Sequence, residues 1–285
     1  MHKAAERLGI SQPAVSRSIS DLEHTLGVRL LDRSRRGVEP TNYGRAIIKR
    51  GIAVFDEIRQ GAKDIEFLTD PTAGELRIGC TEGAAAGPGF VVIDRLASRY
   101  PRIAFNVVTT GAMALYRHLV ERNVDLVIAG IAGAVPEEFV VERLFDDSLV
   151  VAAGVQNPLT RRRRLELAEL LDEPWTLPPL DSFGSALITE AFRASGLETP
   201  RRAIITASRN LRDRLMATGR YLSISTGYSV TPPTNNPLIK ALAVKLPDLR
   251  RPILLITLRN RTLSPLAELF VKTAREVAKT LAKGR

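Results

Sequence analysis

Residue types that build metal sites and disulfides are almost missing from this sequence. Among 285 residues there is one cysteine, Cys80, and the three histidines stand far apart at positions 2, 24 and 118. A single cysteine excludes an intramolecular disulfide and a cysteine-rich zinc site. We therefore expect no metal. Cys80, at the end of a predicted strand, is interpreted as a small buried apolar side chain in preference to a redox switch.

Membrane-spanning runs and catalytic signatures are missing as well. No apolar run reaches the length of about 20 residues that a membrane span needs, and the polar N-terminus does not resemble a secretory signal. Gly79-x-x-x-Gly83 has no phosphate-binding lysine after it. There is also no Gly-x-Ser-x-Gly elbow, zinc-protease motif or dinucleotide-binding glycine pattern. The sequence thus predicts a cytoplasmic protein that is not an enzyme and uses no cofactor.

Positive charge, by contrast, is plentiful. The net charge is +10, and the first 50 residues hold ten Lys/Arg against five Asp/Glu, which places half of the excess in this short segment. Such a local excess favours a polyanion as partner. Four consecutive arginines, 161–164, are interpreted either as a solvated surface run or as a contact with DNA or a partner.

The run Ser11–Arg17 predicts a helix built to lie in a DNA groove. Ser11 is a good N-cap, and Pro13 is tolerated in the first turn, where its missing N–H has no partner to lose. Apolar residues then recur with helical spacing and predict one buried face, at Val15, Ile19, Leu22 and Leu26. The opposite face carries polar groups that can reach base edges or phosphates. The predicted base-reading residues are Gln12, Pro13, Ser16 and Arg17.

A short helix and a hairpin flank this run. Residues 3–9 read as a helix ended by Gly9, which completes a helix-turn-helix. Further along, the strand-like segments 28–33 and 38–40 enclose a basic turn. Such a hairpin is typical of a wing that contacts phosphates or the minor groove. The predicted backbone-contacting residues are Arg33, Arg35 and Arg36.

Together these motifs resemble the winged helix-turn-helix of LysR-type transcriptional regulators. The resemblance covers residues 3 to 45 almost without a gap, through Ala4–Leu8, Ser11–Arg17, Leu22–Arg33 and Thr41-x-x-Gly44. Two departures stand out: Ser18 replaces the family's usual glutamine, and the family has one more helix before this point. The chain begins at Met1 instead. This predicts a start codon placed too late or a truncated product, with a DNA-binding module that lacks part of its core.

Thr41 is suited to cap a long helix that runs to about Leu68. Its apolar positions form a heptad-like seam, at Ile48, Gly51, Phe55, Ile58, Ala62 and Ile65. A seam of this kind packs either on its own domain or on a second copy. Because winged regulators read two half-sites, we favour dimerisation, the role that this segment has in the family. Asp70–Gly74 then reads as a hinge.

Beyond the hinge, strands and helices alternate as they do in α/β folds. Strands are predicted at 75–80, 103–110, 124–131, 148–154, 174–177, 202–206, 221–225 and 252–258, and helices at 88–100, 113–121, 165–171, 185–195, 211–218 and 265–282. Two α/β lobes, with the last strand and helix returning to the first, resemble a type 2 periplasmic-binding-protein fold, the effector domain of the family. The predicted organisation is a winged helix-turn-helix at 1–40, a linker helix and hinge at 41–70, and an effector-binding domain at 71–285, with lobe I at about 74–147 and 248–285 and lobe II at about 148–247.

Ligands of open α/β folds bind beyond the carboxyl ends of the strands, where hydroxyls and helix N-termini suit a small polar or anionic molecule. From these strand ends and the resemblance, the candidate effector-binding residues are Thr81, Thr110, Gly130, Ser182, Phe183 and Thr226. Each can also be read as a turn or capping residue, or in the case of Phe183 as core. Glu82 would compete with an anion, which leaves a sugar-like, amine-bearing or neutral ligand open.

The sequence therefore predicts a sequence-specific DNA-binding transcriptional regulator, controlled by a small-molecule effector bound between two lobes. The resemblance implies double-stranded DNA and RNA polymerase as partners. It also implies a homo-oligomer, a dimer through the linker helix and a tetramer overall, which bends DNA until an inducer relaxes the bend. The alternative is a stand-alone cytoplasmic small-molecule binding protein whose truncated DNA-binding module is non-functional.

Overall fold

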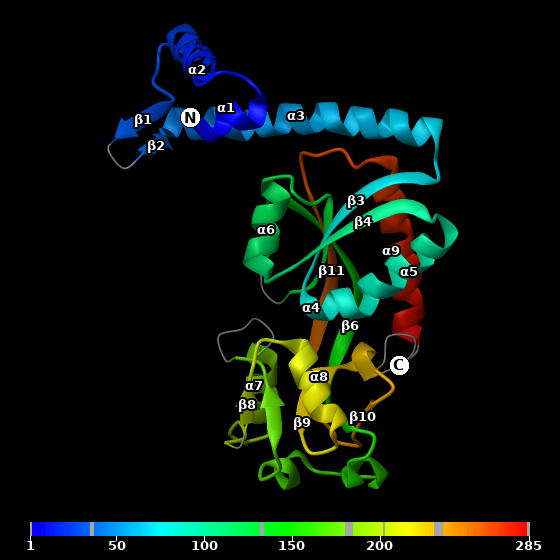
Figure 1. Cartoon of the computed structure of the whole chain (residues 1–285). Coiled ribbons are helices and arrows are strands. Elements are labelled where there is room, and N and C mark those ends of the chain that lie inside the picture. Colours follow the sequence, from blue (N-terminus) through cyan, green and yellow to red (C-terminus); the bar gives the residue numbers. More distant parts are fainter. Residues whose placement is uncertain are drawn as a thin grey trace. The chain divides into compact units, whose positions relative to one another are not determined.

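The computed structural model describes residues 2–34, 37–131, 134–179, 185–201, 203–230 and 236–283 (Figure 1). The chain divides into two compact units, Met1–Gly61 and Ala62–Arg285, which we call the N-terminal and the C-terminal unit. The domain limits at residues 40 and 70 stay a prediction. Over the described ranges, no helix combines the length and the hydropathy of a membrane span.

The N-terminal unit begins with the predicted pair of helices. α1 (His2–Leu8) is followed by a turn at Gly9, whose φ of 64° lies in the left-handed region that glycine adopts freely. α2 (Gln12–Leu26) begins as its cap predicts, because Ser11 Oγ accepts a hydrogen bond from the N–H of Ala14 at 3.3 Å. The local sequence alone thus determines where α2 starts.

The hairpin that follows is shorter than the sequence predicts. β1 (Leu31–Ser34) pairs antiparallel with β2 (Gly37–Pro40), so the first strand begins at residue 31 and not at 28. Glu23 of α2 explains the late start. One of its carboxylate oxygens accepts from the N–H groups of Leu30 at 2.6 Å and Leu31 at 3.1 Å. These two bonds hold the hairpin to α2.

Thr41 and Gly44 join the hairpin to α3 (Asn42–Thr69). Thr41 Oγ1 accepts from the N–H of Gly44 at 3.0 Å, as the predicted cap requires, and the N–H of Thr41 donates to the carbonyl of Leu30 at 2.9 Å. A Cβ atom at position 44 would lie 2.1 Å from that carbonyl oxygen. The motif Thr41-x-x-Gly44 is therefore explained by a close approach of two backbone segments.

The apolar face of α2 is less buried than its spacing predicts. Val15 is buried, but Leu22 and Leu26 keep 41% and 42% of their surface exposed, and Leu8 of α1 is open as well. The prediction of one buried face is therefore wrong for the C-terminal half of α2. The physical reason is that no element of the described chain covers these side chains.

The described strands of the C-terminal unit form one nine-stranded sheet. Their order is β4-β3-β5-β11-β6-β9-β7-β8, and β10 pairs with β6. The strands are β3 (Ala73–Cys80), β4 (Arg102–Thr109), β5 (Leu126–Gly130), β6 (Phe139–Gly154), β7 (Trp175–Leu177), β8 (Ala203–Ile205), β9 (Leu222–Thr226), β10 (Ile239–Ala241) and β11 (Arg250–Leu258). We call the part around β3, β4, β5 and β11 lobe I, and the part around β7 to β10 lobe II.

β6 passes from one lobe into the other, and β11 returns the chain to lobe I (Figure 1). β11 pairs with β6 from Phe139 to Ser148, whereas β9 and β10 pair with the rest of β6. The sequence predicts only residues 148–154 of β6 and omits β10. The first half of β6 is not predicted from the sequence because charged side chains interrupt its apolar pattern. One of them, Glu142, accepts a hydrogen bond at 2.7 Å from the remote Arg275.

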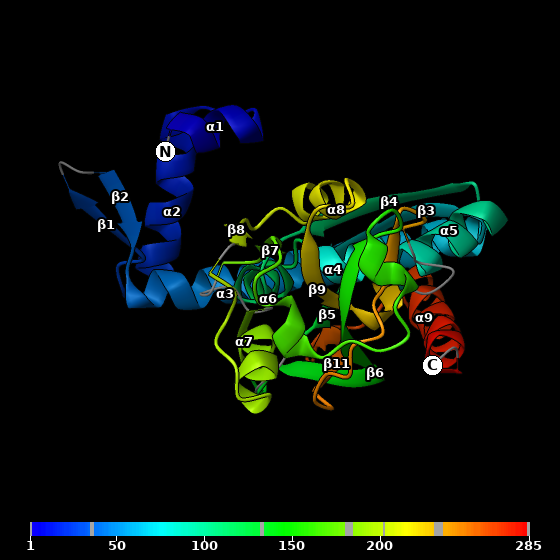
Figure 2. The ribbon, with the colours of Figure 1, turned by 90° about the horizontal axis from the view of Figure 1, so that it is seen from below.

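Helices cover both faces of the sheet in lobe I. α5 (Phe90–Arg99) and α9 (Pro265–Lys283) lie side by side on one face, and α6 (Ala112–Val120) covers the other (Figure 1, Figure 2). Alternate residues of β5 point to opposite faces of the sheet, as the period of two in a strand requires. Leu126 and Ile128 pack in the α5–α9 cluster, and Val127 and Ala129 pack with α6.

Lobe II has its own core and two longer helices, α7 (Ser185–Ala194) and α8 (Arg209–Ala217). Trp175 and Phe192 meet edge to face in this core, with ring centroids 5.6 Å apart. The predicted helix at 165–171 is wrong, because only a 3-10 turn forms at residues 167–170. The remaining short elements are α4 (Glu82–Ala84), the π-turn Ala85–Gly89 and the 3-10 turns Pro158–Arg161, Leu167–Leu170 and Gly227–Val230.

Asp125, just before β5, is a buried anion held by three cations. Its carboxylate accepts from Arg77 Nη2 at 2.6 Å and from Arg261 Nη2 at 2.7 Å, and Lys63 Nζ of α3 lies 3.3 Å away. Burial alone would raise the pKa of Asp125, but the hydrogen bonds from Arg77 and the charges of Lys63 and Arg77 hold that pKa well below its ordinary value. Asp125 therefore fastens the last turns of α3 to lobe I.

Replacing the Asp125 carboxylate tests how much it contributes to the free energy of unfolding. Asp125→Asn leaves the cations without their counter-charge, so the free energy of unfolding should fall by about 3–5 kcal/mol. The lowered pKa means that the carboxylate stabilises the fold fully above its ordinary pKa of 3.8 and less as the pH falls below that value. Urea titrations at several pH values, followed by circular dichroism, measure both effects.

Glu190→Gln is the matched control for this experiment. Glu190 pairs with Arg193 on the exposed surface of α7 at 2.8 Å, so its loss should cost no more than about 0.5 kcal/mol. An Asp125→Asn variant that keeps the acid sensitivity of the unmodified chain would contradict the assignment.

Candidate functional site

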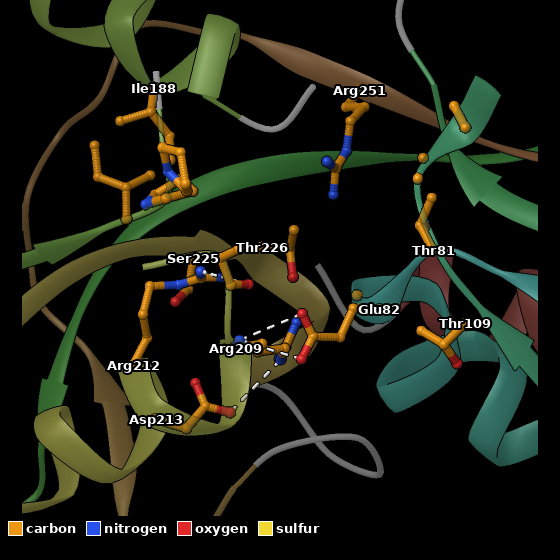
Figure 3. Close-up of a pocket in the computed structure, with 18 of the residues that line it drawn as sticks. Thr81, Glu82, Thr109, Ile188, Arg209, Arg212, Asp213, Ser225, Thr226 and Arg251 are labelled. Atoms are coloured by element: carbon orange, nitrogen blue, oxygen red, sulfur yellow. Dashed lines mark hydrogen bonds and ion pairs between the residues drawn. The ribbon is translucent and has the colours of Figure 1, made fainter. Parts of the chain in front are cut away.

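A cleft of about 560 Å³ opens between the two lobes, where the strand ends predict one (Figure 3). Lobe I supplies the ends of β3, β4 and β5 and the start of α6, and lobe II supplies β9, α7 and α8. Its size is that of an ordinary small-molecule site. The apolar part of its wall is formed by Leu149, Pro178, Pro179, Ile188 and Ile224.

Four of the six candidate effector-binding residues lie in this wall, namely Thr81, Thr110, Gly130 and Thr226. The other two, Ser182 and Phe183, lie outside the described residues. Thr226 is partly engaged, because its Oγ1 lies 3.0 Å from Ser229 Oγ. The hydroxyls of Thr81 and Thr110 have no hydrogen-bond partner in the described chain and are available to a ligand. Ligand contact by all six residues stays a prediction.

Glu82 of lobe I spans the cleft to lobe II (Figure 3). Its two carboxylate oxygens accept from the backbone N–H of Arg209, the first residue of α8, at 3.1 and 3.3 Å. A carboxylate at a helix N-terminus satisfies unpaired N–H groups and meets the positive end of the helix dipole. The charge of Glu82 is thus directed at α8, which weakens the expectation that it repels an anionic ligand.

Two further charged side chains of α8 line the lobe II wall. Asp213 lies 3.5 Å from Arg209 Nε, and burial raises the pKa of Asp213 in spite of the nearby arginines. Arg212 donates to the carbonyl of Thr206 at 2.8 Å, and burial lowers the pKa of its guanidinium. Desolvation therefore disfavours both charges, as is common where a site is shaped to receive a ligand.

Arg251 enters the cleft from β11, between the lobes (Figure 3). Sequence reasoning missed this residue, together with Arg209, Arg212 and Asp213. The only local signal is an arginine that precedes the apolar run of β11. Its neighbour across the strands is Asp147, and that pairing depends on the fold, so the sequence alone could not place Arg251 in the site.

Cys80 is fully buried at the end of β3, and burial raises the pKa of its thiol to about 12. A thiol with a raised pKa gives little thiolate and reacts slowly. The interpretation of Cys80 as an apolar core residue agrees with this environment.

The predicted DNA-contacting residues fall into two groups. Gln12, Pro13 and Arg17 are exposed at the start of α2, and Ser16 is half-buried there. Arg35 and Arg36 lie outside the described residues, as does the side chain of Arg33. Among the four arginines at 161–164, Arg162 and Arg164 pair locally with Glu169 and Glu166 at 3.2 and 3.0 Å, as a solvated run does.

Two family models match separate parts of the chain. "LysR substrate binding domain" matches residues 69–279, and "Bacterial regulatory helix-turn-helix protein, lysR family" matches residues 1–45. The chain belongs to the LysR family. It is thus a DNA-binding transcriptional regulator with an effector-binding domain, as the sequence predicts.

Individual relatives agree with this membership. The regulator GbpR of Azospirillum brasilense is 30% identical over 73% of this chain, and the match spans 61% of GbpR. The RuBisCO operon transcriptional regulator of Allochromatium vinosum is 28% identical over 94% of this LysR-family chain and 88% of its own length.

Solved structures confirm the predicted fold class. CbnR, described as a LysR family transcriptional regulator, has 20% identity and a TM-score of 0.58, and the match covers 96% of this chain and 94% of CbnR. Full-length OxyR from Pseudomonas aeruginosa has 19% identity and a TM-score of 0.68, and the match covers 99% of this chain and 91% of OxyR. At these identities the likeness shows the fold alone.

The contact between Glu82 and α8 can be tested directly. Glu82→Ala removes the acceptor of the Arg209 N–H, so the first turn of α8 should exchange its amide hydrogens about 5- to 10-fold faster, which corresponds to the net value of one ordinary, solvent-exposed hydrogen bond. Hydrogen exchange read by mass spectrometry or NMR measures this change. Glu190→Ala, on the exposed face of α7, should leave α8 unchanged. Equal protection of α8 in both variants would refute the contact.

Proposed function

We propose that this LysR-family chain reads operator DNA through α2 and the β1–β2 hairpin, and that a small molecule in the interlobe cleft controls this reading. The observation that carries the proposal is that one chain joins a capped helix-turn-helix to a polar cleft between two lobes. Thr81, Thr110, Gly130 and Thr226, with Ser182 and Phe183, are the proposed effector contacts. As a regulator of transcription it would act in the cytoplasm.

The control mechanism that we propose is a shift between lobe arrangements. Both lobes contribute walls to the cleft, so a ligand that touches both binds one arrangement better than another. Only such differential affinity can transmit a signal. The favoured arrangement would alter the spacing of two DNA-binding modules in an oligomer, which changes how the DNA is held and bent.

The proposed DNA contacts divide by task. The side chains of Gln12, Pro13, Ser16 and Arg17 would enter the major groove and read base edges. The side chains of Arg33, Arg35 and Arg36 would hold phosphates or the minor groove. The exposure of the first turns of α2 supports this assignment.

We further propose a homodimer through α3. The seam residues Ile48, Phe55, Ile58 and Ile65 are 47%, 75%, 65% and 67% exposed in the single chain. Large apolar side chains lined up along one helix face favour burial against a partner. A second copy is the occupant that the seam fits, since it repeats with the spacing of a two-helix interface. A tetramer, and contact with RNA polymerase, complete the proposal as the family implies them.

The two kinds of DNA contact should separate in binding experiments. Arg17→Ala should weaken binding to selected DNA by about 1–3 kcal/mol and relax base discrimination, whereas Arg35→Ala should weaken binding to all sequences alike and reduce the salt dependence. DNA selected from a random library by the unmodified chain serves as operator, and anisotropy titrations against scrambled DNA at several salt concentrations give both quantities. If Arg17→Ala preserves discrimination, the assignment of α2 as the reading helix is wrong.

The α3 seam can be tested by placing a charge in it. Phe55→Glu would bury an unpaired carboxylate from each copy, so the dimer dissociation constant should rise by about 100-fold or more. Light scattering coupled to size-exclusion chromatography measures the mass. Lys49→Glu introduces the same residue on the opposite side of α3 and should leave the dimer intact. A dimer that survives Phe55→Glu but not Lys49→Glu would place the interface on the other face.

A further inference from the structure

The charges that line the cleft do not balance. Three arginines, Arg209, Arg212 and Arg251, face two carboxylates, Glu82 and Asp213. Both carboxylates are directed at α8, one at its first N–H and the other at the Arg209 side chain. Among the residues that line the pocket, positive charges therefore outnumber negative charges by one, and the buried carboxylate of Asp147 lies just outside this lining, opposite Arg251 on β6.

Arg251 has fewer partners than the other two arginines of the cleft. In the described chain its guanidinium makes no hydrogen bond and no ion pair, and its Nε is buried without an acceptor. Its cross-strand neighbour Asp147 accepts a hydrogen bond from the backbone N–H of Tyr228 through Oδ1, at 3.3 Å. A buried guanidinium N–H without a partner is costly, so an acceptor from outside the chain would relieve it.

Gly130 gives the Arg251 side chain its room. A Cβ atom built at position 130 would lie 2.6 Å from Arg251 Nε and 2.9 Å from its Cζ. The guanidinium therefore rests on the bare backbone at the end of β5. Gly130, proposed above as an effector contact, would then act through Arg251 by leaving that space open.

We propose that the effector of this cleft is a small organic acid whose single anionic group binds the Arg251 guanidinium. A carboxylate accepts in the forked geometry that guanidinium offers. The apolar wall formed by Leu149, Ile188 and Ile224 takes the carbon skeleton, and the free hydroxyls of Thr81 and Thr110 lie in lobe I. One negative charge neutralises the excess of one positive charge. This inference rests on the proposed role of the cleft as the effector site.

Paired compounds test the charge requirement. We would measure the melting temperature of the full chain with a panel of small carboxylic acids, each matched to its primary amide, which keeps the shape and removes the charge. Inorganic phosphate and a panel of phosphate monoesters form a separate arm. Ligands that bind only the folded state raise the melting temperature. We expect stabilisation by one or more carboxylic acids and none by the matching amides.

Substitutions then locate the contact. For an acid that binds, Arg251→Gln should raise the dissociation constant by about 10- to 100-fold, the value of a hydrogen-bonded charge. Arg250→Gln is the matched control, because Arg250 is exposed, lies outside the cleft and pairs with Asp248 at 2.8 Å. It should bind the acid as the unmodified chain does. Gly130→Ala should weaken the binding of the acid as well. The fold should stay intact, since the added methyl group displaces only the flexible end of the Arg251 side chain.

Each outcome bears on a separate claim. Stabilisation only by amides or other uncharged compounds would overturn the organic acid and leave the cleft as an effector site. Stabilisation only by phosphate compounds would overturn the proposal that the ligand is a carboxylic acid. If Arg251→Gln abolishes that stabilisation, an anion still binds at Arg251. Acids that bind Arg251→Gln and the unmodified chain equally would overturn the role of Arg251. If no compound in either arm raises the melting temperature, the result would count against the cleft as an effector site.

Discussion

The antiparallel pairing of β6 with β11 is the interaction on which the C-terminal unit depends. It runs from Phe139↔Leu258 to Ser148↔Arg250, and β6 then continues into lobe II as the partner of β9. Both lobes therefore share one sheet, and the cleft opens where that sheet passes between them. Two lobes that are joined by shared strands at the floor of a cleft have the arrangement in which hinge closure occurs. Arg251 lies on this floor, next to the point where the partners of β6 change.

The parts of the fold that local chemistry determines were accessible from the sequence. The cap at Ser11, the turn at Gly9 and the cap at Thr41 act within a few residues, so a short window contains all the information. Buried central strands such as β5 were equally clear, because both of their faces are apolar. The first half of β6 was not, since its charged residues are explained only by partners such as Arg275, far away in the chain.

The same distinction divides the cleft residues. Thr81, Thr110, Gly130 and Thr226 lie at or just after the carboxyl ends of strands. Ligand sites of open α/β folds form at these ends, so their meeting could be predicted. The arginines and Asp213 come from α8 and from the start of β11, whose positions depend on packing between distant segments. Even the predicted Gly130 has its structural reason in a missed residue, because the space above it is taken by Arg251.

Charge gives a physical link between ligand and lobe arrangement. Closing the cleft removes water from the three arginines and two carboxylates that line it, and desolvating a guanidinium N–H that has no acceptor, as at Arg251, is costly. The contact of Glu82 with α8 draws the walls together, so it works against that cost. An anion on Arg251 removes the excess charge, and the closed arrangement then no longer confines an unpaired guanidinium. On the proposed reading, the effector therefore binds the closed arrangement more tightly than the open one, which is the differential affinity that allosteric control requires.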